Sequence, residues 1–181
     1  FGRDGKRHPC HTQFHLTWKY DSTYQLSFQP TNNLVIIGVE FRNIAIAIAH
    51  KITMPRLDEN VSLPVTEAER WQQYFGKLKQ HELDHARLSS ESTTLNALQK
   101  EIQLIHQIRF GFDNLPKLDA PLIGKLIALT VDTVGQSYAT LIQQRYHLFD
   151  EMTSNGEAEY MRAEIFEKIF GENNPGPRWR R

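Results

Sequence analysis

Cysteine, net charge and long apolar runs are all scarce in this chain of 181 residues. Cys10 is the only cysteine, so no internal disulfide can form within these residues. Lysine and arginine together number 21, as do aspartate and glutamate, so no overall field recruits nucleic acid or an anionic membrane. The longest apolar run, Ile44 to Ala49, is far too short to cross a bilayer. We therefore expect no nucleic-acid partner and no membrane span.

The sequence also lacks the short signatures of several protein classes. It contains no internal repeat, no low-complexity block, no glycine-rich phosphate loop and no nucleophile elbow. With 40% hydrophobic residues the chain can bury one proper core. We expect a single domain over residues 1–170 and a flexible basic tail over 171–181. Because the chain begins at Phe1 with polar and basic residues, we also expect it to be a processed or trimmed form.

The stretch from Trp71 to Leu88 contains the pattern His81-Glu82-Leu83-Asp84-His85 and reads as helix on both sides. On a helix, residues i and i+4 lie one turn apart on the same face, so His81 and His85 can both reach one metal ion. Glu82 lies beside them, and a carboxylate there can take a proton from a metal-activated water. The pattern predicts a zinc site with Glu82 as the general base.

The helical phase of the two histidines indicates that they face inward. One apolar stripe, read in alternating steps of three and four, contains Trp71, Tyr74, Leu78, His81, His85, Leu88, Ser92 and Leu95. Burying two imidazoles and a carboxylate without a partner is costly, and a metal would satisfy all three. The alternative interpretation places the same side chains on a solvated helix face. The phase favours the metal site.

Alternating apolar residues predict strands in the first third of the chain. Thr12 to Tyr20 has period two and is followed by a turn at Asp21-Ser22 and a second short strand around Tyr24 to Phe28. Leu34 to Phe41 and Ile44 to Met54 are rich in valine and isoleucine, with Arg42-Asn43 as a tight link. We expect an antiparallel sheet of three or four strands that ends at Pro55.

Helices are predicted for the rest of the chain. Thr66 is the expected N-cap of the motif helix, with Glu69 as its capping-box partner. The apolar phase continues to about Arg109, as one long helix or two nearly collinear ones. A turn at Asp113 to Pro116 follows. A second long helix is expected from Leu122 to about Thr153, starting near Asp119, with Gly135 and Ala139 allowing close packing. Glu157 to Phe170 is predicted as a last amphipathic helix with Met161, Ile165 and Ile169 inward.

A third metal ligand is expected from the second long helix. If the two helices form an antiparallel hairpin that turns near Pro116, residues at equal distances before and after Pro116 lie side by side. A residue n on the first helix then lies beside the residue numbered about 232 minus n on the second. The histidines then lie level with residues 147 to 151, a window that contains His147, Asp150 and Glu151. Asp150 has the best helical phase, while His147 and Glu151 turn further from the packed side. A solvated aspartate near a helix end is the alternative interpretation of Asp150.

Two groups of residues together carry a family resemblance. The first comprises Ile52 to Pro55 at the end of the sheet, then Trp71, Tyr74, Leu78 and the motif from His81 to His85. The second is a distal signature of Phe149, Asp150, Thr153 and Gly156. In this order, over most of Arg3 to Gly156, they resemble a bacterial family of predicted secreted zinc-dependent proteases, catalogued as a domain of unknown function. The resemblance implies export to the periplasm or beyond.

The chain departs from that family in two places. The family tends to carry histidine before the distal glycine, where this chain has Asn155. We also expect the start of the usual domain to be missing from the given residues. If that histidine is the family's third ligand, the site here is weakened or altered. If the aspartate is the ligand, Asp150 preserves the site.

These observations predict an α+β domain in which a small antiparallel sheet packs on a long antiparallel helical hairpin carrying the motif, plus a short C-terminal helix. The expected function is zinc-dependent hydrolysis of peptide bonds in a protein or peptide substrate. His81, His85 and Asp150 are the expected zinc ligands, Glu82 the base, and Tyr146 a candidate to stabilise the oxyanion.

One rival is a non-catalytic relative that keeps the fold and the metal for binding or structure, and Asn155 favours it. Another is a helical interaction module with a coincidental motif. The sequence does not specify the substrate, the cleavage preference or the oligomeric state.

Overall fold

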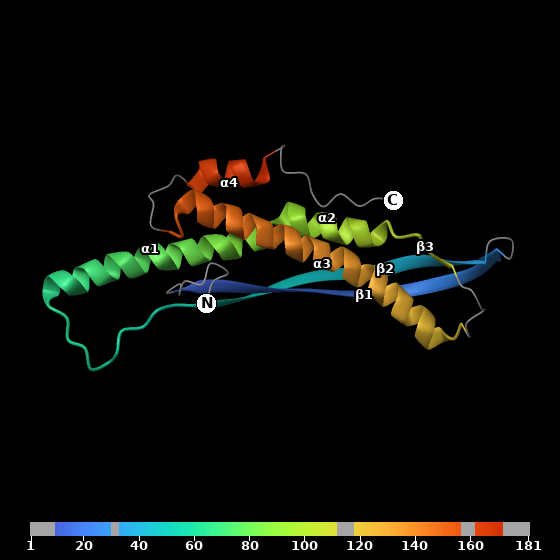
Figure 1. The fold of residues 1–181 in the computed structure, drawn as a ribbon, viewed down its shortest axis with the longest axis horizontal. Helices are drawn as coiled ribbons and strands as arrows, with labels where there is room; N and C mark the ends of the chain where they lie inside the picture. The colour runs from blue at the N-terminus through green and yellow to red at the C-terminus, as the bar shows by residue number, and fades with distance from the viewer. Residues whose placement is uncertain (1–9, 30–32, 112–117, 157–161, 172–181) are drawn as a thin grey trace. The chain divides into compact units, whose positions relative to one another are not determined.

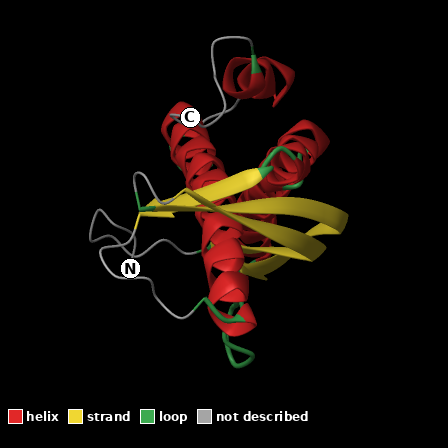
Figure 2. Ribbon diagram, turned by 90° about the vertical axis from the view of Figure 1, so that its right-hand side faces the viewer, coloured by secondary structure: helices red, strands yellow, loops and turns green. Residues whose placement is uncertain are grey.

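The structure is a computed structural model that describes residues 10–29, 33–111, 118–156 and 162–171 (Figure 1). Along the chain the elements are β1 (His11–Gln29), β2 (Leu34–Thr53), α1 (Val65–Ser89), α2 (Ser92–Gln103), β3 (Gln107–Gly111), α3 (Ala120–Thr153) and α4 (Arg162–Phe170). The three strands form one sheet in the order β1-β2-β3. Figure 2 shows these strands together with the helices, and the fold is of the predicted α+β class.

The chain divides into two compact units. The motif unit comprises Phe1–His15, Ile48–Glu91 and Leu141–Arg181, and the sheet unit comprises Leu16–Ala47 and Ser92–Thr140. Helices α1 and α4 belong to the motif unit, whereas α2 and β3 belong to the sheet unit. Strands β1 and β2 and helix α3 each contribute residues to both units.

Strands β1 and β2 are each continuous, so the predicted breaks at Asp21-Ser22 and Arg42-Asn43 are wrong. The prediction relied on residues that commonly form turns. In the sheet unit the Asn43 side chain instead donates a hydrogen bond to Asp21 Oδ2 at 2.7 Å. Asn43 has a φ of 50°, in a left-handed region that asparagine tolerates better than most residues. The residues around Tyr24 to Phe28 continue β1 and are exposed, so they do not form a separate half-buried strand.

The third strand, β3, lies where the sequence predicted the end of the motif helix. Helix α1 ends at Ser89, α2 ends at Gln103, and Gln107–Gly111 pairs antiparallel with β2, so that Ile36 is opposite Arg109. The predicted helix continues too far along the chain. The alternation of Ile108 and Phe110 has the period of a strand, and it marks where the helical pattern ends. Pairing with β2 satisfies this segment's backbone groups, so tertiary context overrides the helical preference.

The sheet unit is packed around one face of β2. Its buried apolar side chains come from β1, β2, α2 and α3, and include Leu16, Val35, Ile37, Val39, Phe41, Leu98, Ile102, Ile123, Ile127 and Val131. A Cβ added to Gly135 of α3 would lie 2.3 Å from the Trp18 ring of β1. Trp18 Nε1 also donates a hydrogen bond to Asp132 Oδ1 at 3.0 Å. The small residue therefore permits the close packing that the sequence predicted.

The ends of α3 and the C-terminal end of α4 agree with the sequence, whereas the start of α1 does not. Helix α1 begins at Val65 after Pro64 with no side-chain cap, so the predicted Thr66 cap is wrong. The fixed φ of Pro64 suits a helix start, and its carbonyl accepts the first backbone hydrogen bonds. The Asp119 carboxylate accepts a hydrogen bond from Leu122 N at 3.0 Å, which agrees with the predicted start of α3.

Helix α4 confirms the predicted last helix from Arg162 onward, with Ile165 and Ile169 buried. Met161, the predicted turn at residues 113–116 and the predicted tail from residue 172 lie outside the described residues. None of the helices in the described part of the chain is long and apolar enough to span a membrane.

Candidate metal centre

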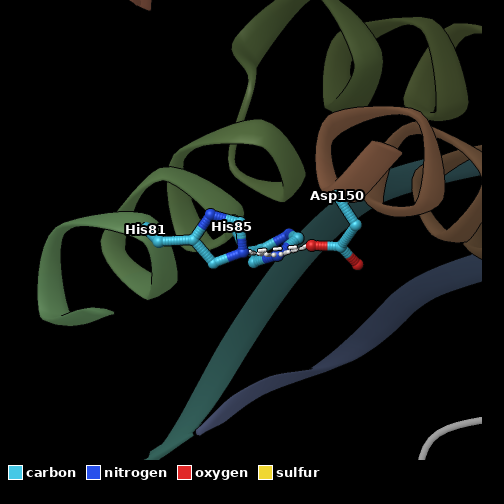
Figure 3. Close-up of side chains that lie close together, drawn as sticks. All are labelled: His81, His85 and Asp150. Atoms are coloured by element: carbon cyan, nitrogen blue, oxygen red, sulfur yellow. Dashed lines mark hydrogen bonds and ion pairs between the residues drawn. The ribbon is translucent and has the colours of Figure 1, made fainter. Parts of the chain in front are cut away.

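Three potential ligand atoms from two helices converge in the motif unit (Figure 3). His81 Nε2 and His85 Nε2 lie 3.0 Å and 2.9 Å from Asp150 Oδ1, and 3.1 Å from each other. Both imidazoles are almost fully buried, whereas the Asp150 side chain is 32% exposed. The carboxylate therefore closes one side of a buried histidine pair and faces solvent in part.

The two helices explain this convergence. His81 and His85 lie one turn apart on α1, and Asp150 lies on the last turns of α3. Asp150 reaches the histidines, as predicted, although the count assumed a helix up to the turn near Pro116, whereas α2 ends at Gln103 and β3 follows. His147 and Glu151 are exposed and do not join the cluster. Asn155 is also exposed and lies beyond the end of α3.

Aromatic rings hold the two imidazoles in place. The Phe149 ring stacks on His81 with centroids 5.0 Å apart and meets His85 edge-on at 5.1 Å. The Tyr146 ring lies 4.4 Å from the His85 ring. Phe149 and Tyr146 are both buried, so these packed neighbours restrict both rings without occupying their Nε2 atoms.

Thr153 orients the ring of His81. Its Oγ1 donates a hydrogen bond to Phe149 O at 2.8 Å, which uses the hydroxyl proton. The same Oγ1 lies 3.4 Å from His81 Nδ1 and is left able to accept. A proton kept on Nδ1 is the tautomer that a metal needs, because Nε2 can then exchange its hydrogen bond to Asp150 for a bond to a metal.

The segment after α3 folds back against His81. Ser154, Asn155 and Gly156 all have positive φ, and Asn155 N donates a hydrogen bond to Asp150 O at 2.9 Å. Gly156 is buried with a φ of 85°, and a Cβ added there would lie 2.9 Å from His81 Cγ. The position therefore needs glycine both for its backbone conformation and for its closeness to the ring.

The electrostatics of the cluster favour an ionised Asp150. Burial acts to raise the pKa of the Asp150 carboxyl, but hydrogen bonds from His81 and His85 and their positive charge outweigh it, so the pKa is well below its usual range. The cluster thus presents an anionic oxygen next to two imidazole nitrogens. This is a donor set that suits a divalent cation.

The Tyr146 hydroxyl is engaged away from this donor set. It donates a hydrogen bond to Ser89 Oγ at 2.8 Å, and Ser89 Oγ lies 2.7 Å from His50 Nε2. Ser89 Oγ in turn donates to His85 O at 3.1 Å. Burial raises the pKa of the Tyr146 phenol. An oxyanion role for Tyr146 stays a prediction, and in this geometry the residue ties β2, α1 and α3 together behind His85.

Glu82 is held from the start of the sheet. It is 2% exposed, and Thr12 Oγ1 lies 2.6 Å from its Oε2 and 3.0 Å from its main-chain oxygen. Cys10 lies two residues earlier in the chain and is buried. Burial, followed by the neighbouring Glu82, raises the pKa of the Cys10 thiol. Glu82 is therefore an enclosed carboxylate beside the two metal-facing histidines.

Helix α4 is fastened to the motif helix by an ion pair. Arg162 Nε lies 2.7 Å from Asp84 Oδ2, and Asp84 is buried within the motif itself. The Arg87 guanidinium lies over the Phe166 ring, 4.9 Å from its centroid. The same face of α4 buries Ile165. These contacts attach α4 to the face of α1 that carries Asp84 and Arg87.

The donor geometry fits a tetrahedral metal. Around zinc with bonds of about 2.0 to 2.1 Å, neighbouring ligand atoms lie roughly 3.3 Å apart. The three separations of 2.9, 3.0 and 3.1 Å fall within a few tenths of an ångström of that value. His85 Nδ1 is buried with no hydrogen-bond partner among the described residues. Packing therefore holds this ring, and its Nε2 atom faces the shared centre.

The match to a known family covers the HExxH motif but not Asp150, the third candidate ligand. A family described as bacterial protein of unknown function (DUF922) matches residues 1–103, more than half of the chain. The chain belongs to the DUF922 family. No curated protein and no solved structure matches it. The DUF922 match includes Thr12, Glu82 and both histidines, whereas Asp150 lies beyond it. The place of Asp150 in the centre thus rests on the tertiary structure.

The sequence pointed to some residues around the centre and missed others. The distal signature contains Phe149, Thr153 and Gly156, all of which contact His81 or lie close to its ring. Thr12 was visible only as the first residue of a predicted strand. Ser89 and His50 carried no signal, because their hydrogen bond joins residues 39 positions apart in the chain.

Proposed function

We propose that this member of the DUF922 family is a zinc-dependent peptidase. The observation that carries the proposal is the convergence of two imidazole nitrogens and one carboxylate oxygen within 3.1 Å of one another. The two histidines belong to a motif that pairs metal ligands with an adjacent acid on one helix. Asp150 supplies the third protein ligand that such enzymes need.

The donor set favours a catalytic site over a structural one. Structural zinc sites are closed by four protein ligands, whereas catalytic sites use three and keep one position for water or substrate. Among the residues that the structure describes, no fourth histidine, cysteine, aspartate or glutamate joins His81, His85 and Asp150. Partial exposure of Asp150 gives that side of the cluster access to solvent.

The chain's own residues divide the work of peptide hydrolysis. His81, His85 and Asp150 hold the ion, and Phe149 and Thr153 keep the His81 ring in place. A bound zinc ion supplies Lewis acidity that polarises a peptide carbonyl and activates water. Glu82 would accept a proton from the attacking water and deliver it to the departing amine. The substrate is therefore a protein or peptide.

The rival proposal is a non-catalytic relative that keeps the metal. Asn155 favours this rival, because the asparagine stands where the family tends to carry a histidine that could be the third ligand. Asn155 is exposed and outside the cluster, while Asp150 lies within reach of both histidines. This placement supports the peptidase over its rival. Export to the periplasm or beyond, which the family resemblance implied, stays a prediction.

The test replaces Glu82 with glutamine in the purified protein after zinc reloading. We expect the bound zinc, measured by elemental analysis, to stay near that of wild type, because Glu82 is not a ligand. Hydrolysis of a fluorescence-quenched peptide library should fall by about 10²- to 10⁴-fold, the usual contribution of a general base. Glu151→Gln is the matched control, because Glu151 is an exposed carboxylate on α3.

Two results would overturn the proposal. Undiminished hydrolysis by Glu82→Gln would refute the base role. A zinc-loaded wild type that hydrolyses no peptide, with a fourth protein ligand seen by X-ray absorption spectroscopy, would decide for the non-catalytic rival.

A further inference from the structure

A side chain far from the motif in sequence engages the carboxylate of Glu82. Thr12, in the second position of β1, is separated from Glu82 by 70 residues. Its Oγ1 lies 2.6 Å from Glu82 Oε2 and 3.0 Å from the main-chain oxygen of the same residue. Both residues belong to the motif unit, and Glu82 is almost fully buried. The strand therefore contacts the motif at the residue that carries the proposed chemistry.

The chemistry of this contact is that of an orienting hydrogen bond. The Thr12–Glu82 contact of 2.6 Å lies at the short end of the range for O–H···O hydrogen bonds. Threonine is branched at Cβ and has few accessible rotamers, so its hydroxyl is held in a nearly fixed direction. Such a bond confines the Glu82 carboxylate to one orientation. A base held in this way reaches the water in the same geometry in every turnover.

The neighbours of Thr12 explain why its hydroxyl can stay in place. The Phe14 ring, two residues further along the strand, packs edge-on against Tyr146 with centroids 5.5 Å apart. Tyr146 in turn packs on His85 and bonds to Ser89 at the end of α1. The beginning of β1 is thus fastened at Thr12 and at Phe14. Both attachments lie in the motif unit that contains the ligands.

We propose that Thr12 is a positioning residue that orients the Glu82 carboxylate for proton transfer. This inference rests on the proposed peptidase function and assigns a task to a residue outside the motif. Thr12 touches neither the substrate nor the metal. It acts through Glu82.

The test compares two substitutions that separate the hydroxyl from the shape of the side chain. Thr12→Val keeps the branched shape and removes the donor, whereas Thr12→Ser keeps the donor. We expect Thr12→Val to lower kcat by about 10- to 100-fold, as the loss of a hydrogen bond to a residue beside a metal commonly does, with KM and zinc content unchanged. Thr12→Ser should recover most of the loss. Thr17→Val is the matched control, because Thr17 lies on the same strand and donates to Ala47 O at 3.3 Å in the sheet unit.

A binding measurement separates this inference from peptidase activity. Acetohydroxamate chelates zinc and offers an acidic proton to a neighbouring carboxylate, so its affinity reports on the orientation of Glu82. In zinc-loaded protein, calorimetry should show weaker acetohydroxamate binding for both Thr12→Val and Glu82→Gln, and wild-type binding for Thr17→Val.

Each outcome bears on the two proposals differently. Weakened binding by Thr12→Val in a protein that hydrolyses no peptide would support the orienting bond and overturn the peptidase. Wild-type kcat and wild-type acetohydroxamate affinity in Thr12→Val would overturn the inference and leave the peptidase standing. A wild-type protein that binds no zinc would overturn both.

Discussion

Replacing Gly156 with alanine tests the packing between the end of α3 and the metal-site helix. Gly156 is buried and follows Thr153 by three residues, where the chain turns back against His81. An added Cβ would lie 2.9 Å from Cγ, 3.1 Å from Cβ and 3.2 Å from Nδ1 of His81. The backbone φ of 85° is also a conformation that alanine rarely adopts.

The expected cost follows from these two features. A left-handed conformation costs a residue with a Cβ about 1 to 2 kcal/mol. Overpacking a well-filled site costs about 1 to 3 kcal/mol more. The free energy of unfolding of Gly156→Ala should therefore be lower than that of wild type by roughly 2 to 5 kcal/mol. Zinc affinity should also fall, because relief of the contact moves the His81 ring or the segment that carries Asp150.

Urea unfolding of the metal-free protein measures the first effect, and zinc titration measures the second. Gly76→Ala provides the matched control on α1, because nothing lies within 4 Å of a Cβ added there. Alanine forms helices better than glycine, so the free energy of unfolding of Gly76→Ala should be about 0.5 to 1 kcal/mol higher than that of wild type. Its zinc affinity should equal that of wild type.

One result would refute the reasoning about Gly156. The free energy of unfolding of Gly156→Ala could lie within about 0.5 kcal/mol of the wild-type value, the range of an ordinary surface substitution. If its zinc affinity also equals that of wild type, the end of α3 does not pack against His81.

Two further predictions concern the third ligand and helix α4. Zinc at 100 times its dissociation constant should raise the free energy of unfolding by about 2.7 kcal/mol, measured by thermal unfolding with and without zinc. Asp150→Ala should lose this stabilisation by zinc. His147→Ala, a change at an exposed position, should keep it. Arg162→Ala should lower the free energy of unfolding by roughly 1 to 3 kcal/mol, because it removes the ion pair between Arg162 and the buried Asp84 carboxylate. Equal loss in Lys168→Ala, an exposed cation on the same helix, would contradict that reasoning.

Much of the centre was predictable because helices are periodic. The spacing of His81 and His85 places both on one face of a helix whatever surrounds it. A count along two antiparallel helices with a constant rise per residue pointed to Asp150, although part of the counted stretch is not helix, because α2 ends at Gln103 and β3 follows. The exposed positions of His147 and Glu151 follow from the same phase. These predictions needed only local geometry and one assumption about the topology.

The strands were harder to predict because their partners are distant in the sequence. Asp21 and Asn43 are turn formers by composition, yet they meet across neighbouring strands and leave each strand continuous. The segment after Ile105 continued a helical pattern and became β3, because β2 had an edge to pair with it. Local preference is weak where a non-local partner can satisfy the same backbone groups.

The sequence by itself determined the chemistry that this protein can offer: two histidines and a glutamate on one turn of a helix, and an aspartate level with them. Only the tertiary structure decided which groups surround them. It placed the Thr12 hydroxyl on Glu82, Thr153 beside His81, and the Tyr146 hydroxyl on Ser89. The physical reason is that helical periodicity is a property of the backbone, whereas a hydrogen bond between distant side chains exists only after the chain has brought them together.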